Sequence, residues 1–213
     1  MNYILCYGDS NTWGASPDRL PRFDFQTRWP GVLRRCMGDG VHVYENALCG
    51  RTTGFTDDVE PGRNGREGFR YILEMNAPLD LVIIMLGSND CKARFRGHPA
   101  WDSALNLRCL LREAGRPDYG RLCSEKPALL VVAPSALRDD WSGSWVAEEF
   151  DAGSAEKSRK LAPLYERAAR EYGAAFLDAS DYARPGVDCV HLTAPGHAAL
   201  GEAIARKAKE LLG

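Results

Sequence analysis

Three residues that together can activate a nucleophile stand near the two ends of this 213-residue chain. Ser10 follows a short apolar run, and His191 lies three residues after Asp188 near the C-terminus. A serine hydroxyl becomes a strong nucleophile when a base removes its proton. An imidazole can serve as that base, while a nearby carboxylate holds the tautomer of the ring and stabilises the imidazolium. The residue types therefore favour acyl transfer through a covalent serine intermediate.

Two further residues can supply the hydrogen-bond donors that such a reaction needs on the attacked carbonyl oxygen. Gly50 follows a predicted strand, and Asn89 follows another in the segment Gly87-Ser88-Asn89. A glycine lets the backbone approach a substrate closely because it has no Cβ. An asparagine amide donates hydrogen bonds without carrying a charge. Each feature alone is typical of an ordinary turn or cap, but the four together, in this chain order, favour a catalytic site.

Apolar runs and helical patterns alternate along the chain and predict the frame that positions these residues. The expected strands are 3–7, 41–46, 80–86, 128–133 and 174–177. The expected helices are 30–37, 101–114, 154–172 with Ser154 as its cap, and 195–212. This alternation predicts a doubly wound parallel sheet. Ligands of such sheets bind beyond the carboxyl ends of the strands, so we expect the residues that follow the first three strands to meet there.

The composition predicts one globular domain over residues 1–213, with 45% hydrophobic and 26% charged residues. A formal net charge of −2 offers no basic surplus for a nucleic-acid backbone or an anionic membrane. The longest apolar run, 81–86, is far shorter than the roughly 20 residues of a membrane-spanning helix. A small-molecule substrate is therefore the expected partner, with no nucleic acid and no membrane.

The N-terminus and the cysteines predict a cytoplasmic protein. No basic segment precedes the first apolar run, which is unlike a secretory signal. The seven cysteines, Cys123 among them, are scattered and include no C-x-x-C pair, so we expect reduced thiols.

Other classes of function find less support. Nucleotide binding lacks both a G-x-G-x-x-G segment after the first strand and a Walker loop. A metal-dependent hydrolase could use Asp188 and His191 as ligands, but no further ligand stands near them in the sequence. We therefore expect neither a metal nor a cofactor. A catalytically silent binding protein on the same fold is an alternative that only an assay excludes.

Four segments of the chain carry a recognisable combination of motifs. They are GDSNTWG at 8–14, GRTT at 50–53, GSND at 87–90 and DCVHL at 188–192. Together they resemble the four blocks of the SGNH (GDSL-type) hydrolase superfamily. Trp13-Gly14, the segment 28–33 (RWPGVL) and the run 79–90 (LDLVIIMLGSND) resemble a bacterial arylesterase and acyltransferase branch. The resemblance covers nearly the whole chain and implies a three-layer α/β/α flavodoxin-like sandwich with a five-stranded parallel sheet.

The resemblance also implies a role for each motif residue. Ser10 would be the nucleophile, His191 the general base and then acid, and Asp188 its orienting partner. The implied oxyanion donors are the backbone N–H groups of Ser10 and Gly50 and the side-chain amide of Asn89. The implied reaction is hydrolysis or transfer of short acyl groups from small or aryl esters, without a cofactor. Removal of O-acetyl groups from carbohydrates is the leading alternative.

Substrate contacts are expected from Trp13, Arg51 and Thr52, although an aromatic residue such as Trp13 is as often core filling. Asn11 stands where many relatives carry Leu or Ile, and Ser88 where they often carry Thr. These departures bear on the preferred acyl group and not on the reaction type.

Two segments outside the motifs also carry expectations. The loop 61–68 (PGRNGREG) is either a solvated surface loop or a contact between subunits or a wall of the active site. The resemblance implies a homo-oligomer, because members of the branch form oligomers whose loops narrow the channel to the active site, and the loop 61–68 is a candidate for that role. His197, in the last predicted helix, is expected to face solvent or to cap the helix.

Overall fold

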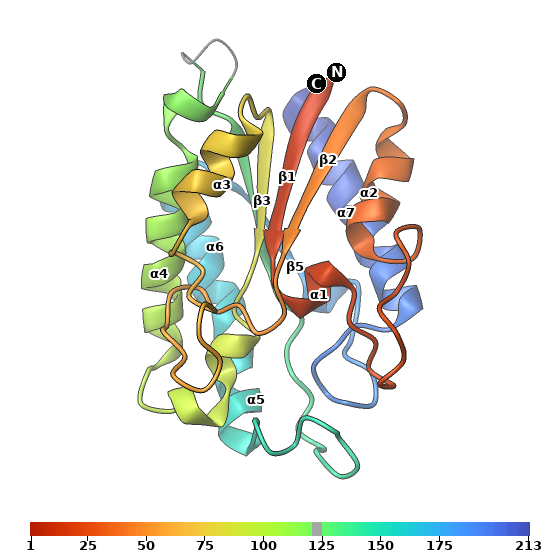
Figure 1. Ribbon diagram of the computed structural model, residues 1–213, viewed down its shortest axis with the longest axis vertical. Coiled ribbons are helices and arrows are strands. Elements are labelled where there is room, and N and C mark those ends of the chain that lie inside the picture. Colours follow the sequence, from red (N-terminus) through yellow and green to blue (C-terminus); the bar gives the residue numbers. More distant parts are fainter. Residues whose placement is uncertain (121–124) are drawn as a thin grey trace.

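The computed structural model describes residues 1–120 and 125–213 and places a five-stranded parallel sheet between two layers of helices (Figure 1). The strands are β1 (Asn2–Gly8), β2 (Val41–Ala47), β3 (Leu81–Met85), β4 (Ala128–Ala133) and β5 (Ala175–Asp178). Their order in the sheet is β2-β1-β3-β4-β5, which is the order of flavodoxin-like folds. The predicted three-layer sandwich is confirmed.

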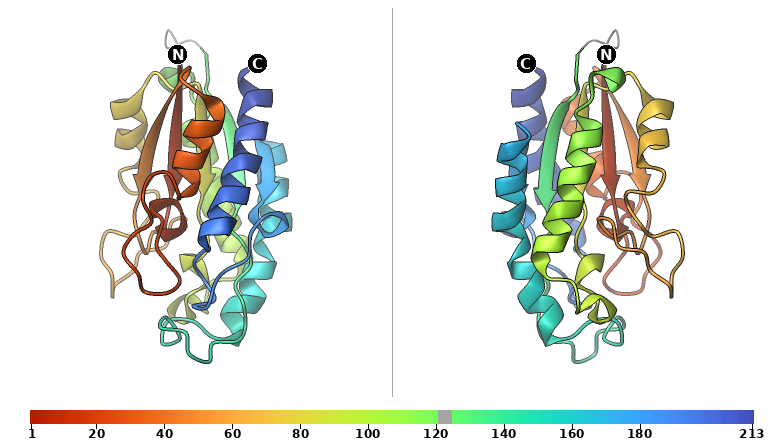
Figure 2. Two further views of the ribbon diagram at one scale, coloured as in Figure 1. Left: turned by 90° about the vertical axis from the view of Figure 1, so that its right-hand side faces the viewer. Right: turned by 90° about the vertical axis from the view of Figure 1, so that its left-hand side faces the viewer.

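The helices cover both faces of the sheet. They are α1 (Ser10–Trp13), α2 (Trp29–Met37), α3 (Phe69–Asn76), α4 (Ala100–Ala114), α5 (Ala152–Arg159), α6 (Leu161–Glu171) and α7 (Ala194–Leu212). The two views of Figure 2 show α2 and α7 side by side on one face, and α4 and α6 on the other. Because helices lie on both sides, the central strands can be apolar throughout.

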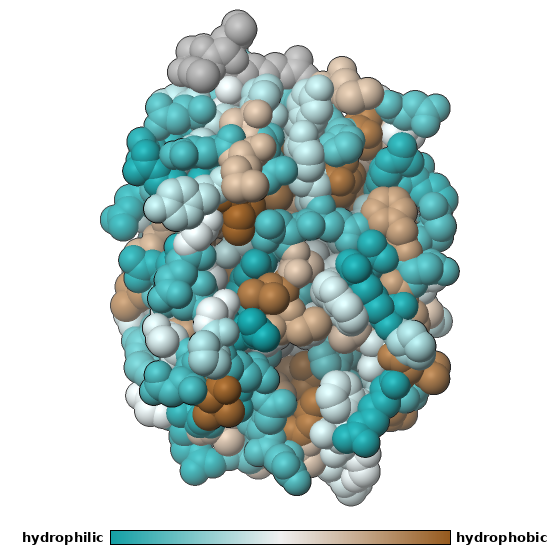
Figure 3. All heavy atoms as spheres, viewed as in Figure 1, coloured by the Kyte–Doolittle hydropathy of each residue, from teal (hydrophilic) through white to brown (hydrophobic). Residues whose placement is uncertain are grey.

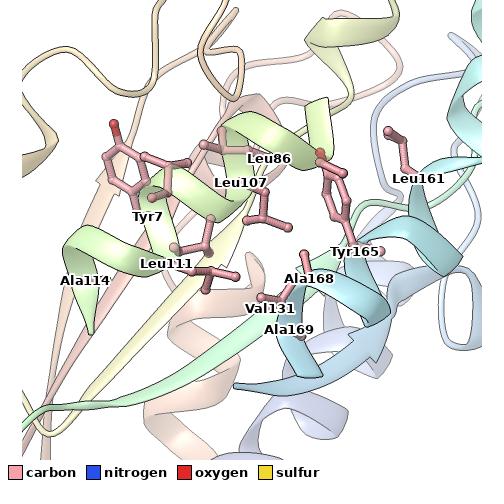
Figure 4. Close-up of a cluster of buried hydrophobic side chains, with 14 of the residues drawn as sticks. Tyr7, Leu86, Leu107, Leu111, Ala114, Val131, Leu161, Tyr165, Ala168 and Ala169 are labelled. Carbon is pink, nitrogen blue, oxygen red and sulfur yellow. The ribbon is translucent and has the colours of Figure 1, made fainter. Parts of the chain in front are cut away.

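Side chains of β3 alternate between two separate cores, because successive residues of a strand point to opposite faces. Leu81, Ile83 and Met85 pack in the core beneath α2 and α7. Val82 and Ile84 pack in the core beneath α4 and α6. Figure 4 shows the second core, where side chains of α4, α6 and the strands meet. Burial on both sides makes the sheet a rigid base for the loops that follow its strands.

The carboxyl ends of the strands all lie at one end of the molecule. In Figure 1 the strand arrows point toward α1 and the long loops, while both chain termini lie at the opposite end. The face seen in Figure 3 is largely hydrophilic, with apolar residues in separate small patches. The residues after β1, β2 and β3 are therefore brought together as the sequence predicts.

The helices differ from the prediction in two places. The expected helix 154–172 is divided into α5 and α6, which meet at Lys160. Pro163 in the first turn of α6 has no N–H for a helical bond and crowds the carbonyl four residues earlier, so a continuous helix is disfavoured here. The cap is Asp151, whose side chain accepts from the Ser154 N–H, while the Ser154 hydroxyl accepts from the Asp151 N–H. Helix α3 has eight residues and was not predicted, because so short a pattern carries little periodic signal.

His197 does not face solvent or cap α7, so that prediction is wrong. The residue is fully buried, and its Nδ1 lies 3.4 Å from the backbone nitrogen of Trp29 in α2. The buried residues of α7 include Leu200, Gly201 and Ile204, which share its helical face at spacings of three, four and seven. Since α7 packs on α2 along this face, His197 becomes part of the core.

The described residues also bear on the predictions about membrane-spanning helices, cysteines and the loop 61–68. In ranges 1–120 and 125–213 no helix is both long and apolar enough to span a membrane. Six cysteines in these ranges are free, and Cys123 lies outside them. The segment 61–68 is a loop, joined to the chain near Gly50 by a β-bridge between Thr52 and Asn64.

Candidate active site

Ser10 lies directly beyond the carboxyl end of β1, as the first residue of the one-turn helix α1. Asp9 caps this turn, because its Oδ1 accepts from the backbone N–H of Asn11 at 3.0 Å. A Cβ on Gly8 would lie 1.9 Å from Thr12 Oγ1, so the tight turn requires a glycine there. The serine is thus held at a sharp strand-to-helix turn with 5% of its surface exposed.

His191 and Asp188 meet Ser10 in a continuous chain of hydrogen bonds. His191 Nε2 lies 2.9 Å from Ser10 Oγ, and His191 Nδ1 lies 2.6 Å from Asp188 Oδ2. The backbone N–H groups of Val190 and His191 donate to Asp188 Oδ1 at 2.9 and 2.8 Å, and the carboxylate is fully buried. A carboxylate at Nδ1 favours the tautomer whose Nε2 accepts a proton. The arrangement is that of a nucleophile, a base and an orienting acid.

Asn11 ties the histidine loop to the serine turn. Its amide Nδ2 donates to the Val190 carbonyl at 3.2 Å, and its Oδ1 accepts from the Leu192 N–H at 2.9 Å. These bonds flank His191 on both sides, so they fix the ring beside Ser10. We expected this position to bear on the acyl preference, and its hydrogen bonds instead give it a positioning role that a Leu or Ile could not fill.

Three residues with hydrogen-bond donors line the same cavity, namely Ser10, Gly50 and Asn89. In the described part of the chain, the backbone N–H groups of Ser10 and Gly50 donate to no other protein atom. Asn89 is 5% exposed, and its Nδ2 donates one hydrogen to the Arg51 carbonyl at 3.1 Å, which leaves the other free. Gly50 has φ of +81°, a conformation that favours glycine. The three donors can therefore act as an oxyanion hole.

Asp90 fixes the segment that carries Gly50. It is fully buried, its Oδ2 accepts from the Thr53 N–H at 2.9 Å, and its Oδ1 accepts a very short bond from the Thr53 hydroxyl. Burial raises the pKa of Asp90, and the bonds from Thr53 oppose that rise. Asn89 and Asp90 both form hydrogen bonds to the segment after Gly50. The Gly50 N–H and the Asn89 amide are therefore held in a fixed position relative to each other.

Asp9 is a second buried carboxyl group next to the nucleophile. Burial raises its pKa to about 6, opposed by the Asn11 N–H and then by His191. Its Oδ2 has no hydrogen-bond partner in the described residues. Asp9 makes no hydrogen bond to the His191 ring, whose Nδ1 contacts Asp188.

Of the three predicted substrate contacts, one lines the cavity. Trp13 does so, whereas Arg51 and Thr52 are buried behind it. Arg51 Nη1 donates to the carbonyls of Gly8 and Asn46 at 2.9 and 2.8 Å. Thr52 Oγ1 donates to the Phe55 carbonyl at 2.7 Å. Both side chains are placed to hold the Gly50 segment and not to touch a ligand.

The cavity in front of Ser10 has a volume of about 640 Å³. Trp145 forms part of its wall and stacks on the His191 ring with 5.7 Å between ring centroids and 11° between planes. The Trp145 indole N–H donates to the Pro17 carbonyl at 3.0 Å, which fixes the stack. No sequence signal pointed to Trp145, because it lies in a long irregular loop far from any motif.

An ion cluster built on the buried side chains of Lys92 and Asp57 joins three segments of the wall. Lys92 is 4% exposed, and its Nζ lies 2.6 Å from Glu149 and 3.1 Å from Glu60. Arg94 pairs with Asp57 at 2.7 Å and with Glu149 at 3.2 Å. The cluster links the segment after Gly50, the segment after Asn89 and the loop that holds Trp145. Breaking these pairs would leave the buried charges of Lys92 and Asp57 without a partner, so the cluster holds the wall in one arrangement.

No group of three potential metal-ligating side chains comes together within residues 1–120 and 125–213.

Comparisons with known proteins agree with this geometry. A model described as the GDSL-like lipase/acylhydrolase family matches residues 6–199. The structure of an aryl esterase from M. smegmatis is 37% identical, with 100% of both chains covered and a TM-score of 0.91. That of a carbohydrate acetylesterase from Sinorhizobium meliloti is 34% identical, with 99% of this chain and 100% of that chain covered and a TM-score of 0.90. The search of curated proteins gave no match.

Proposed function

The chain belongs to the GDSL-like lipase/acylhydrolase family, and we propose that it is an esterase in which Ser10 forms an acyl-enzyme intermediate. The observation that carries this proposal is the hydrogen-bonded chain from Ser10 Oγ through His191 to Asp188, with distances of 2.9 and 2.6 Å. The free N–H groups of Gly50 and Ser10 and the Asn89 amide support it from the other side of the attacked carbonyl.

In the first half of the reaction, Ser10 Oγ attacks the ester carbonyl carbon while its proton passes to His191 Nε2. The negative charge that forms on the carbonyl oxygen is bound by the donors of Ser10, Gly50 and Asn89. Each such donor contributes about 3 to 4 kcal/mol to the stability of the transition state. The tetrahedral intermediate then collapses, the bond to the alcohol breaks, and the imidazolium returns its proton to the leaving oxygen.

In the second half, a water molecule replaces the alcohol. His191 takes a proton from the water, whose oxygen attacks the acyl carbon, and the bond to Ser10 Oγ breaks as the serine regains its proton. An alcohol in place of water gives acyl transfer. Both outcomes use the same residues, so we include transferase activity in the proposal.

The substrate is a small ester. A cavity of about 640 Å³ has the size of a small-molecule site, and the aryl esterase at 37% identity supports short acyl or aryl esters. Removal of acetyl groups from carbohydrates is the second candidate, favoured by the acetylesterase at 34% identity and by charged hydrogen-bonding groups such as Lys92 and Arg63 in the cavity wall.

The setting of the protein is also part of the proposal. Six free cysteines in the described residues are compatible with the reducing cytoplasm. A homo-oligomer follows from the family resemblance alone, and sedimentation of the purified protein tests it.

Replacement of Ser10 by alanine tests the central assignment. We expect Ser10→Ala to lose hydrolysis of an aryl acetate by at least about 10⁵-fold, because the nucleophile is gone. The circular dichroism spectrum of the variant should match that of the wild type, because a single hydroxyl that lines the cavity contributes little to the stability of the fold. Turnover near the wild-type rate would contradict the proposal.

A further inference from the structure

The Gly/Arg-rich loop 61–68 brings one arginine into the cavity wall. The Arg63 carbonyl accepts from the Thr52 N–H at 2.9 Å. The Gly65 N–H donates back to the Thr52 carbonyl at 3.1 Å. These bonds fix the backbone of Arg63 against Thr52, which follows Gly50 by two residues, so the Arg63 side chain starts from a defined position.

The guanidinium of Arg63 lies against Gly50. Its Nε stands 3.1 Å from the point that a Cβ on Gly50 would occupy, which only a glycine allows. This Nε is buried and has no hydrogen-bond partner in the described residues, although Arg63 lines the cavity. An unpaired buried donor on a charged group is costly, so such a donor in a binding cavity indicates an acceptor that arrives with the ligand.

The carboxylates near Arg63 are already bound. Glu60 and Glu149 also line the cavity, and both pair with Lys92 at 3.1 and 2.6 Å. Arg63 and Arg19 line the cavity without an ion pair to any carboxylate of the described residues. The cavity lining includes Arg19, Arg22, Arg63 and Lys92 against Glu60 and Glu149, so it carries more positive than negative side chains although the whole chain has a net charge of −2. Such a cavity concentrates anions.

The position of Arg63 also says which part of an ester would carry the charge. The leaving oxygen faces His191, which returns the proton to it, and Trp145 stacks on that ring. Arg19 lies over Trp145 at 5.4 Å, on this leaving-group side. Arg63 lies instead beside Gly50, which binds the carbonyl oxygen, and so is placed to meet the acyl part.

We propose that the preferred substrate carries a carboxylate at the far end of its acyl group and that Arg63 binds this carboxylate. This inference rests on the proposed esterase function and names its substrate class, a half-ester of a short dicarboxylic acid. A guanidinium can bind a carboxylate through two parallel hydrogen bonds, which would satisfy the unpaired Nε. Arg63 is then a specificity-determining residue and takes no part in the bond-breaking steps.

The test compares two esters that differ only in charge, an aryl hydrogen glutarate and the matching aryl methyl glutarate, with uncatalysed release of the phenol subtracted. We expect the wild type to have a higher kcat/KM for the charged ester. Arg63→Met should lower the ratio of the two kcat/KM values about 10- to 100-fold, mainly through KM of the charged ester. Arg63→Lys should restore part of the ratio, and high salt should reduce it.

Arg66→Met is the matched control. Arg66 lies in the same loop, is exposed, and reaches Asn106 at 3.4 Å rather than the cavity, so its loss should leave the ratio as in the wild type. An equal kcat/KM for both esters in the wild type, or an equal loss of both in Arg63→Met, would overturn the inference. So would a charge preference seen only when the carboxylate is moved to the alcohol, as in 4-acetoxybenzoate against its methyl ester.

The proposed esterase function is judged separately in the same assays. Hydrolysis of an aryl acetate that depends on Ser10 would uphold it whichever glutarate ester is preferred. Loss of charge discrimination with that activity intact therefore overturns only the role of Arg63.

Discussion

The loop before α7 and the first turns of α7 each hold a buried histidine, and the two differ in every contact that matters for chemistry. His191 has a bonding partner at both ring nitrogens, Asp188 at 2.6 Å and Ser10 at 2.9 Å, and it lines the cavity. His197, six residues later, has one long contact from the Trp29 N–H at 3.4 Å, and its Nε2 has no partner in the described residues. Its ring instead packs edge-on against Phe23.

The difference teaches that burial alone does not make a histidine a catalyst. Burial, with smaller contributions from the neighbouring charges of His191 and Arg28, lowers the pKa of His197 to about 4. A ring held neutral in a core behaves as a packing residue. A ring that joins a carboxylate on one side to a hydroxyl on the other can accept a proton and hold it while a bond breaks.

Replacing Asp188 by asparagine should lower activity more than the other changes below, because it alters the carboxylate partner of His191 Nδ1, which His197 lacks. An amide at this position favours the wrong tautomer of His191, whose Nε2 then carries a hydrogen and cannot take the proton of Ser10. We expect kcat for an aryl acetate to fall about 10⁴-fold in Asp188→Asn. A stopped assay with concentrated enzyme measures the activity that remains. A fall in kcat of less than about tenfold would contradict the role of Asp188.

Removing a proposed oxyanion donor should have the next largest effect. Because both contacts of His191 stay in place, this variant separates the contribution of the donor from that of the histidine. Asn89→Ala should lower kcat about 10²- to 10³-fold with a small change in KM, since the charge on the carbonyl oxygen exists only in the transition state. Asn106→Ala, on the exposed side of α4, is the matched control and should keep full activity. Equal changes in kcat for both variants would speak against an oxyanion role.

Replacing His197 by glutamine should leave catalysis nearly intact and instead alter how stability depends on pH. His197 has a folded-state pKa lowered to about 4, so the unfolded chain binds its proton more tightly and stability is lost as pH falls from 6.5 toward 4. Wild-type protein should lose about 2 kcal/mol between pH 7.5 and pH 5 from this residue, and His197→Gln should not.

Urea unfolding of both proteins at the two pH values measures this difference. The raised pKa of Asp9, about 6, acts in the opposite direction in both proteins, because a protonated buried acid costs less as pH falls. Its effect cancels when the two proteins are compared. Parallel pH dependences would show that His197 is not the neutral buried ring described above.

The meeting of the candidate site residues was predictable because it depends on strand ends. Ser10, Gly50 and Asn89 follow strands whose apolar runs are clear in the sequence, and parallel strands end at one edge of the sheet. Their types also limit what they can do there. The fixed spacing of Asp188 and His191 placed the carboxylate within reach of the ring.

The wall of the cavity was not predictable in the same way. Trp145, Lys92 and Arg63 come from long loops without a period, and their meeting depends on ion pairs and on a single β-bridge. Arg51 follows Gly50 directly but turns back to the ends of β1 and β2, because two carbonyl groups there accept its hydrogens. The prediction for His197 was wrong because it relied on the polarity of histidine. The spacing of His197 to Leu200 and Ile204, which places it on the buried face of the helix, is the better indicator.

Covalent labelling of the nucleophile tests the central claim most directly. An organophosphate ester such as diethyl 4-nitrophenyl phosphate reacts with an activated serine and leaves a diethyl phosphoryl group on it. We predict one such group per chain by intact-protein mass, located on Ser10 by peptide mass spectrometry and formed in step with the loss of esterase activity. An adduct on another residue while Ser10 stays unmodified and activity is lost would contradict the account.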